Sequence, residues 1–239
     1  MNKLSVALAV FVKTPGLSPV KTRLAAALGR HRAEAFYRLS VAAVEATARA
    51  AAASNDVIPY WAVAEESGLA DARWQTFSRV NQGTGGLGER LGCVFGELHQ
   101  RHGAVIAIGG DSPQVTPQLI RRACSRLRQT GSRFAHVLGR CHDGGFYLVG
   151  TNRSLPPQLW RDVPYSTPDA ATRLAARLAA LGPIADLPPL ADVDRAEDMA
   201  VLGDELRAIV DPSAEQLAVL NWIVTNCQAR MTNDSSSKF

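Results

Sequence analysis

The chain has 239 residues, of which 46% are hydrophobic and 20% are charged. This composition supplies enough apolar material for a sizeable core and excludes disorder over most of the length. The formal charge of +4 is mild and the basic residues are dispersed, so the charge favours an anionic ligand over nucleic acid. The four cysteines stand far apart without a Cys-x-x-Cys pair, which argues against a zinc site or a disulfide framework and indicates reduced thiols in a cytoplasmic protein.

The first apolar run covers residues 4–12 and follows Lys3. A charged start and an apolar centre imitate a secretory signal peptide. The run has only nine residues and ends at Lys13 without a small-residue cleavage site, and no other run approaches the roughly 20 residues that span a membrane. We therefore interpret it as the buried first strand of a parallel sheet.

Beyond this strand, apolar segments and amphipathic helical patterns alternate along the chain. Further strands are expected at residues 57–63, 77–80, 104–109, 134–138 and 145–149, with a short apolar segment at 184–187. Helices are expected at residues 20–53, 87–100, 117–129, 167–181 and 214–227. This order predicts the α/β class, a three-layer αβα sandwich with a mainly parallel, Rossmann-like sheet. We expect a single domain over residues 1–230 and a flexible tail at 231–239.

A basic loop, residues 13–23 (KTPGLSPVKTR), follows the first strand. Lys13, Lys21 and Arg23 bring three cations to the start of a helix, which suits the phosphates of a nucleotide. A solvated basic turn is the alternative. Neither the G-x-G-x-x-G turn nor the P-loop motif occurs at this strand, which weakens a dinucleotide-binding enzyme and a P-loop NTPase.

A second candidate segment, residues 81–90 (NQGTGGLGER), has four glycines and opens directly into a helix. Glycine lets the backbone approach a ligand closely. Gln82, Gly86 and Arg90 are the candidate nucleotide contacts, and a plain surface loop is the alternative.

The acidic candidates begin with residues 109–113 (GGDSP), directly after the most apolar strand. A buried, unpaired Asp111 would be costly, and a divalent cation would compensate it. Because Mg²⁺ takes one or two carboxylates together with phosphate oxygens, a second carboxylate is needed. Residues 192–194 (DVD) can supply it, since alternate residues of an extended segment share a side. The alternatives are that Asp111 or Asp194 caps a helix. For the helix that follows Asp111, Thr116 is the closer cap candidate.

A fifth segment, residues 142–147 (HDGGFY), places Asp143 in a glycine turn that enters a strand. Asp143 could orient the acceptor or a water on the metal, and a tight turn alone is the alternative. All five segments lie near strand ends or helix starts. Because ligands of parallel sheets bind outside the carboxyl ends of the strands, we expect Asp111 and Asp194 to meet in one crevice.

The chain resembles the GT-A superfamily of nucleotide-diphospho-sugar transferases, in its bacterial branch described as a domain of unknown function. It is also similar to the guanylyltransferases of molybdopterin and deazaflavin cofactor synthesis. The matching segments are residues 11–24, 86–91, 110–117, 143–150, 163–167 and 192–198. The resemblance implies the GT-A fold and Mg²⁺ (or Mn²⁺) held by Asp111 and by Asp194 or Asp192. The implied nucleotide contacts are Lys13, Thr14, Lys21, Arg23, Gln82, Gly86 and Arg90, and the implied catalytic residues are Asp111, Lys21 and Asp143.

The resemblance implies a Mg²⁺-dependent transferase that uses a nucleoside triphosphate or a sugar nucleotide and a small-molecule acceptor. Nucleotidylyl transfer to a phosphorylated acceptor is preferred, because the basic first loop and an Asp111 followed by Ser-Pro look like those of nucleotidylyltransferases. Glycosyltransferases more often have Asp-x-Asp at this place, and glycosyl transfer is the alternative. A noncatalytic nucleotide-binding regulatory module is the second alternative. No nucleic acid and no membrane span are expected, and a homodimer stays open.

Overall fold

The computed structural model describes residues 5–53, 56–129 and 135–233. Within these residues seven strands form one sheet in the order β3-β2-β1-β4-β6-β5-β7. The strands are β1 (Val6–Val12), β2 (Val57–Val63), β3 (Ser78–Asn81), β4 (Ala104–Gly109), β5 (His136–Cys141), β6 (Phe146–Thr151) and β7 (Ile184–Leu190). All neighbours pair in parallel except β6, which runs antiparallel to β4 and β5. The predicted α/β class with a mainly parallel sheet is confirmed.

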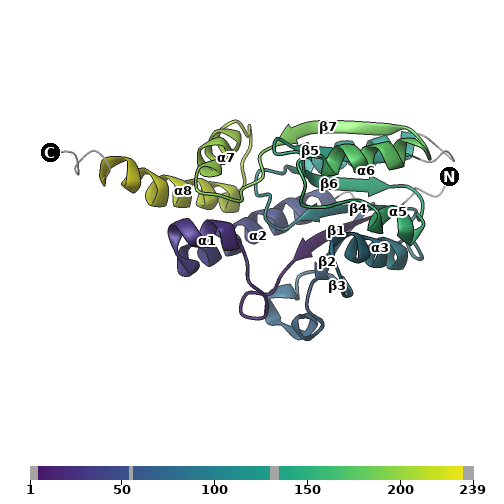
Figure 1. Ribbon diagram of the computed structural model, residues 1–239, viewed down its shortest axis with the longest axis horizontal. Helices are drawn as coiled ribbons and strands as arrows, with labels where there is room; N and C mark the ends of the chain where they lie inside the picture. Colours follow the sequence, from purple (N-terminus) through teal and green to yellow (C-terminus); the bar gives the residue numbers. More distant parts are fainter. Residues whose placement is uncertain (1–4, 54–55, 130–134, 234–239) are drawn as a thin grey trace.

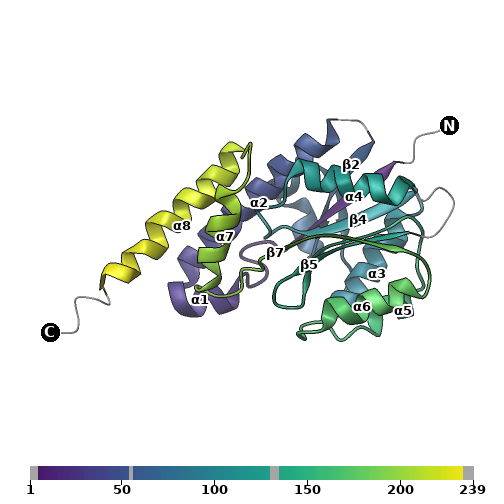
Figure 2. The ribbon, with the colours of Figure 1, turned by 90° about the horizontal axis from the view of Figure 1, so that it is seen from above.

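Helices cover both faces of the sheet (Figures 1 and 2). One face packs against α2 (Arg30–Ala52) and α4 (Pro117–Gln129). The other face packs against α3 (Leu87–Leu98), α5 (Pro157–Arg161) and α6 (Ala170–Ala179). A further group, α1 (Thr22–Leu28), α7 (Asp198–Arg207) and α8 (Ala214–Asn233), shares a core with α2 at the end of the molecule toward which β1 points.

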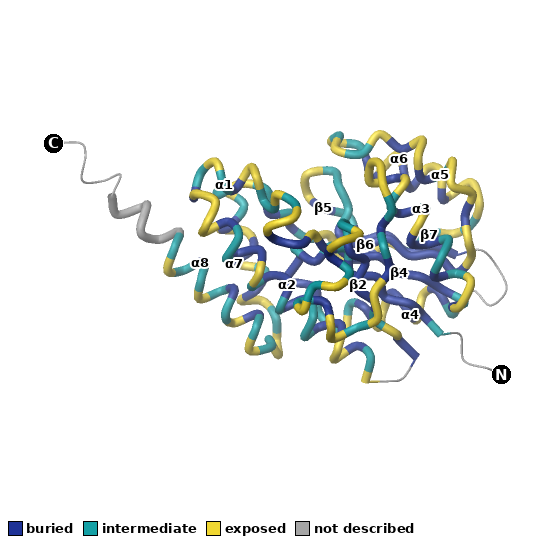
Figure 3. Tube along the Cα trace, turned by 90° about the horizontal axis from the view of Figure 1, so that it is seen from below, coloured by how far each residue is buried: buried dark blue, intermediate teal, exposed yellow. Residues whose placement is uncertain are grey.

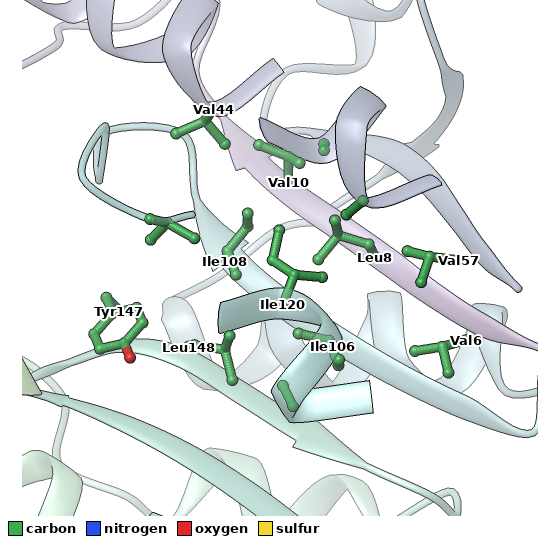
Figure 4. Packing of buried hydrophobic residues seen from close by; sticks show 14 of the residues in the cluster. Val6, Leu8, Val10, Val44, Val57, Ile106, Ile108, Ile120, Tyr147 and Leu148 are labelled. Carbon is green, nitrogen blue, oxygen red and sulfur yellow. The ribbon is translucent and has the colours of Figure 1, made fainter. Parts of the chain in front are cut away.

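The residue pattern of β1 explains why it lies in the middle of the sheet. Its alternate residues face opposite sides, so Val6, Leu8 and Val10 pack into the core shared with α2 and α4, where Figure 4 shows them near Ile106 and Ile108. The intervening Ala7 and Ala9 face the α3 side. Both faces are apolar because both are covered by helices, and Figure 3 shows the central strands as the most buried part of the chain.

Several boundaries differ from the sequence-based expectation. The expected helix at residues 20–53 is two helices, α1 and α2, because Gly29 between them has a φ of 86°. The apolar segment at 184–187 is strand β7, which includes Pro188 and Pro189. Proline is tolerated there because β7 is an edge strand that pairs only with β5. Helix α5 and the short 3-10 helices Glu66–Ala70 and Ala72–Trp74 were not predicted, and α7 was predicted only as an alternative in which Asp194 caps it.

The C-terminal helix is longer than expected. Helix α8 continues to Asn233, whereas the pattern predicted its end near residue 227. The predicted tail, residues 231–239, therefore begins as helix, and its remainder from 234 onward lies outside the described residues. Among the helices described, none combines the length and the apolar character needed to cross a membrane. Cys93, Cys124 and Cys141 are free thiols.

We expect the stability of the fold to fall in mild acid because of His136, at the start of β5. Its side chain is buried, and burial lowers its pKa to about 4. Below the ordinary histidine pKa of about 6.5 the unfolded chain takes up a proton that the folded protein excludes, so stability is lost as the pH falls from 6.5 toward 4. The expected loss between pH 7 and pH 4.5 is about 2–3 kcal/mol. Urea unfolding of the wild type and of His136→Gln at both pH values measures it.

His31→Gln is the matched control, because His31 is exposed on α2. We expect it to keep the wild-type difference between the two pH values, whereas His136→Gln reduces that difference by about 2–3 kcal/mol. The remaining difference comes from other groups such as His99, whose pKa burial also lowers to about 4. Equal pH dependence in wild type and His136→Gln would assign the acid sensitivity to other groups.

Candidate active site

A cleft of about 820 Å³ lies at the carboxyl ends of β1 and β4. Within the sheet, β2 lies on one side of β1, and β4 lies on its other side. This is the topological switch point, where open α/β sheets bind ligands. The polar side chains that line the cleft are Lys13, Thr22, Lys21, Arg23, Tyr37, Gln82, Arg90, Asp111, Ser166 and Asp194. The cleft thus brings together residues from the first loop, the glycine-rich segment, the end of β4 and the acidic segment at 192–194.

Lys21 joins three of these segments. Its ammonium nitrogen Nζ lies 2.7 Å from Oδ2 of Asp111 and donates a hydrogen bond of 2.7 Å to the carbonyl oxygen of Val193. Oδ1 of Asp192 is 3.9 Å away. The Lys21 side chain is only 4% exposed. Burial by itself would lower its pKa, but the negative charges of Asp111 and Asp192 outweigh burial and raise the pKa. The lysine therefore stays charged.

The side chain of Asp111 lines the cleft. Its Oδ1 occupies space that only a glycine leaves, because a Cβ on Gly109 would lie 2.6 Å from that oxygen. The side chain is 37% exposed. Burial would raise the pKa of Asp111, but the ammonium of Lys21 holds it below the ordinary value. The alternative that Asp111 caps α4 is wrong, because Thr116 takes that role and accepts the backbone N–H of Leu119 at 3.2 Å.

The acidic segment lies against the same cleft. Oδ2 of Asp194 pairs with the guanidinium of Arg23 at 2.5 Å. Asp192 lies nearer to Lys21 and Asp111, and burial together with the negative charge of Asp111 raises its pKa to about 6. The structure therefore places Asp111 and Asp194 on the walls of one cleft, with Asp192 beside them.

The alternative that Asp194 caps the following helix is wrong. Helix α7 begins later, at Asp198. The carboxylate of Asp198 accepts hydrogen bonds from the backbone N–H groups of Asp194 and Arg195. The capping interaction thus runs in the opposite direction and holds the acidic segment in place.

The predicted nucleotide contacts Lys13 and Gln82 differ in their exposure. Lys13 is exposed on the cleft wall. Gln82 is buried and its amide donates to the carbonyl oxygens of Val12 and Ala62, while its Oε1 accepts from Arg90 at 3.1 Å. Gln82 therefore holds Arg90 toward the cleft.

Two predicted contacts have local structural roles. Thr14 is fully buried, and its Oγ1 accepts a hydrogen bond of 3.0 Å from the indole of Trp74. Thr14 therefore stabilises the basic loop through its contact with Trp74. Because its side chain is buried, it does not face the cleft as a nucleotide contact, which corrects the prediction. Gly86 caps α3, where its N–H donates to Glu89 at 3.0 Å, and its neighbours Gly85 and Leu87 line the cleft.

A second chamber of about 340 Å³ adjoins the cleft and contains the predicted Asp143. The two cavities share Arg23, Leu87, Ser166 and Asp194. Sequence reasoning missed Ser166, which has a φ of 64°. In the described part of the chain, Lys21 and Ser166 are the non-glycine residues with positive φ, a costly conformation that clusters at functional sites. Only the quoted segment 163–167 pointed to this region of the sequence.

The carboxylates of the cleft are the candidate ligands for a divalent cation. Among the described residues no group of three or more histidine, cysteine, aspartate or glutamate side chains is arranged to hold a metal ion. Mg²⁺ needs fewer protein ligands, because phosphate oxygens and water complete its shell. The cleft carries two carboxylates of the kind that Mg²⁺ takes, Asp111 and Asp194, which are paired with Lys21 and Arg23.

Comparisons with known proteins agree with this architecture. The family model described as "Uncharacterized protein conserved in bacteria (DUF2064)" matches residues 40–167. No curated protein matches the chain in sequence. Among solved structures, a putative nucleotide-diphospho-sugar transferase from Desulfovibrio desulfuricans G20 is 21% identical with a TM-score of 0.79, over 94% of this chain and 97% of that one.

Two further structures are more distant. Rv0371c from Mycobacterium tuberculosis H37Rv is 16% identical with a TM-score of 0.53, over 83% of this chain and 97% of its own. The 4-diphosphocytidyl-2C-methyl-D-erythritol synthase from Anaerococcus prevotii DSM 20548 is 9% identical with a TM-score of 0.50, over 96% and 100%. These similarities confirm the predicted α/β fold with a mainly parallel sheet between helices.

Proposed function

This chain belongs to the family of uncharacterized bacterial proteins DUF2064, and we propose that it is a transferase that binds a nucleotide-activated donor and passes part of it to a small-molecule acceptor. The observation that carries the proposal is the cleft at the β1/β4 switch point, where Lys13, Lys21, Arg23 and Arg90 face Asp111. Cations suit the phosphates of a nucleotide. Asp111 pairs with Lys21, and its carboxylate, exposed to the cleft, can in addition hold a cation that accompanies the phosphates.

In the proposed complex, the donor's phosphates lie against Lys13, Lys21 and Arg23, and Arg90 reaches them from the start of α3. Gln82 acts by holding Arg90, and the backbone at Gly86 lies where helix amides favour an anion. Asp111 and Asp194 would hold Mg²⁺ or Mn²⁺, which when bound neutralises phosphate charge and polarises the reacting phosphoryl group. Catalysis by these residues is alignment and electrostatic stabilisation.

Nucleotidylyl transfer is the preferred reaction. An acceptor oxygen forms a bond to the α-phosphorus of a nucleoside triphosphate, and the bond from that phosphorus to the bridging oxygen breaks. Pyrophosphate leaves with the electron pair, and its charge develops beside Lys21 and Arg23. Where the acceptor group is a hydroxyl, it donates a hydrogen bond to the carboxylate of Asp143 in the adjoining chamber. That carboxylate takes the hydroxyl proton and passes it to solvent.

Glycosyl transfer is the second candidate. The chamber beside the cleft, with Asp143 and Ser166 on its wall, offers room for a sugar next to the donor's phosphates. The similarity to the Desulfovibrio structure, which is described as a putative nucleotide-diphospho-sugar transferase, supports it. In this reaction the acceptor oxygen attacks the anomeric carbon of a sugar nucleotide, and a nucleoside diphosphate leaves with the electron pair. A regulatory module without turnover would bind the nucleotide and release neither product.

Calorimetric titration with nucleoside triphosphates and with sugar nucleotides, each with and without Mg²⁺, tests the proposal. We expect at least one nucleotide to bind, with an affinity that Mg²⁺ raises about 10- to 100-fold, and we expect Asp111→Asn to remove this gain. A triphosphate preference favours nucleotidylyl transfer, and a sugar-nucleotide preference favours glycosyl transfer. Asp211→Asn, at an exposed carboxylate between α7 and α8, serves as the control that keeps the wild-type response. Absence of nucleotide binding, or an unchanged Mg²⁺ gain in Asp111→Asn, would overturn the proposal.

A further inference from the structure

The second chamber differs from the cleft in its charge. Its acidic lining residues are Asp143, Asp192 and Asp194, and its one cation among the described residues is Arg23. The guanidinium of Arg23 is already paired with Asp194 at 2.5 Å. The donor cleft, in contrast, carries Lys13, Lys21 and Arg90 as well. Cations therefore outnumber carboxylates in the larger cavity, where Asp111 and Asp194 are the carboxylates, and carboxylates outnumber cations in the smaller one.

This difference in charge restricts what the chamber can bind. A phosphate monoester carries about −1.5 to −2 charges at neutral pH and would meet carboxylates with no unpaired cation to offset them. Hydroxyl groups, in contrast, donate short charge-assisted hydrogen bonds to carboxylates. The volume of about 340 Å³ lies at the small end of the range of roughly 300–1,000 Å³ found for ligand pockets.

Part of the chamber lining is apolar. The rings of Phe146 and Tyr165 line the chamber, with centroids 6.2 Å apart and planes at 60°. Ser166 and Thr167 add hydroxyl groups to the lining, and Ser166 also lines the donor cleft. Aromatic faces pack well against the C–H surface of a ring or chain that points its hydroxyls elsewhere. The chamber thus offers both hydrogen-bonding groups and apolar surface to a ligand.

The chamber is also pre-formed. Oδ1 of Asp143 accepts the N–H of Gly145 at 2.9 Å, which fixes the carboxylate on its turn. The carbonyl of Gly144 accepts from the N–H of Ala171 at 2.9 Å, so this turn rests on the start of α6. Ser166 lines both cavities and stands where an acceptor would meet the donor.

We infer that the chamber lined by Asp143, Phe146 and Tyr165 is the acceptor subsite and takes an uncharged, hydroxyl-rich small molecule, a sugar or a polyol. This inference rests on the proposed function for its donor. It replaces the phosphorylated acceptor that the sequence favoured. It leaves both transfer reactions open, because a hydroxyl can attack either a phosphorus or an anomeric carbon.

Saturation-transfer NMR on the full chain tests the inference with glucose, mannose, ribose and glycerol, and with glucose 6-phosphate, mannose 6-phosphate, ribose 5-phosphate and glycerol 3-phosphate. We expect binding of at least one unphosphorylated compound and at least tenfold weaker binding of its phosphate ester. The variant Asp143→Lys is expected to reverse this order. Asp211→Lys, an exposed charge reversal outside both cavities, is expected to keep the wild-type order.

The inference is overturned if a phosphate ester binds the wild type more tightly than its parent compound. It is equally overturned if no unphosphorylated compound binds, or if Asp143→Lys leaves the order unchanged. Preference for glucosamine over glucose would point to a cationic acceptor and overturn it as well. The nucleotide titrations are measured separately, so loss of nucleotide binding is distinguished as failure of the proposed function, while the sugar measurements still decide the chamber.

Discussion

Replacing Lys21 by methionine is expected to weaken nucleotide binding at least 100-fold and to lower the free energy of unfolding by about 2 kcal/mol. The buried ammonium holds Asp111 at 2.7 Å and the carbonyl of Val193 at 2.7 Å. Its removal leaves Asp111 and Asp192 facing each other without a cation between them. Breaking a buried pair commonly costs about 3–5 kcal/mol, and the smaller value applies because Asp111 is 37% exposed to the cleft. Calorimetric titration and urea unfolding measure the two effects.

Lys13→Met is the matched control for this variant. Lys13 is a second lysine of the same cleft, but unlike Lys21 it is exposed to solvent. We expect about tenfold weaker nucleotide binding from the loss of one phosphate contact and a change in unfolding free energy within about 0.5 kcal/mol. Equal stability losses in the two variants would show that Lys21 does not organise the site. A Lys21→Met protein that binds nucleotides as the wild type does would remove Lys21 from the proposed donor site.

Replacing Gly144 by alanine is expected to destabilise the protein by about 3 kcal/mol or more. The residue has a φ of 91°, and an added Cβ would lie 1.7 Å from the carbonyl oxygen of Pro168. Backbone atoms on both sides leave no flexible side chain to move aside, so the turn that carries Asp143 must separate from the start of α6. Thermal unfolding measures the loss. Because the turn forms one wall of the chamber, the variant is also expected to lose binding of the sugars named above.

Gly29→Ala separates the cost of the backbone angle from the cost of the clash. Gly29 has a similar φ of 86°, but an added Cβ there meets nothing within 4 Å. Its expected cost is about 1 kcal/mol, that of placing alanine at positive φ. The excess in Gly144→Ala then measures the contact with Pro168. If both variants lose the same stability, the turn is not held against α6 as tightly as the structure shows.

Local patterns were sufficient where one element carries its own signal. Strand β4 and helix α4 occur with the predicted bounds. A continuous apolar run and an amphipathic period within a segment themselves indicate which of its residues are buried. Helix α5 was missed, since it has only five residues and its burial depends on Trp160 packing against α3. The break at Gly29 was missed as well, because a single glycine inside a helical period does not by itself show that the chain turns.

The sequence alone determined the elements, their alternation and the segments that carry charge, because these follow from spacing and composition along the chain. Only the tertiary structure decided which charges meet. Lys21 was predicted to bind phosphate, yet its ammonium also bridges Asp111 and a carbonyl 172 positions away. Thr14, within the same basic loop, faces Trp74 and not the cleft. The energy of a charge or a hydroxyl depends on the groups within a few ångströms of it, and the folded chain brings those groups from segments whose distance in sequence carries no such information.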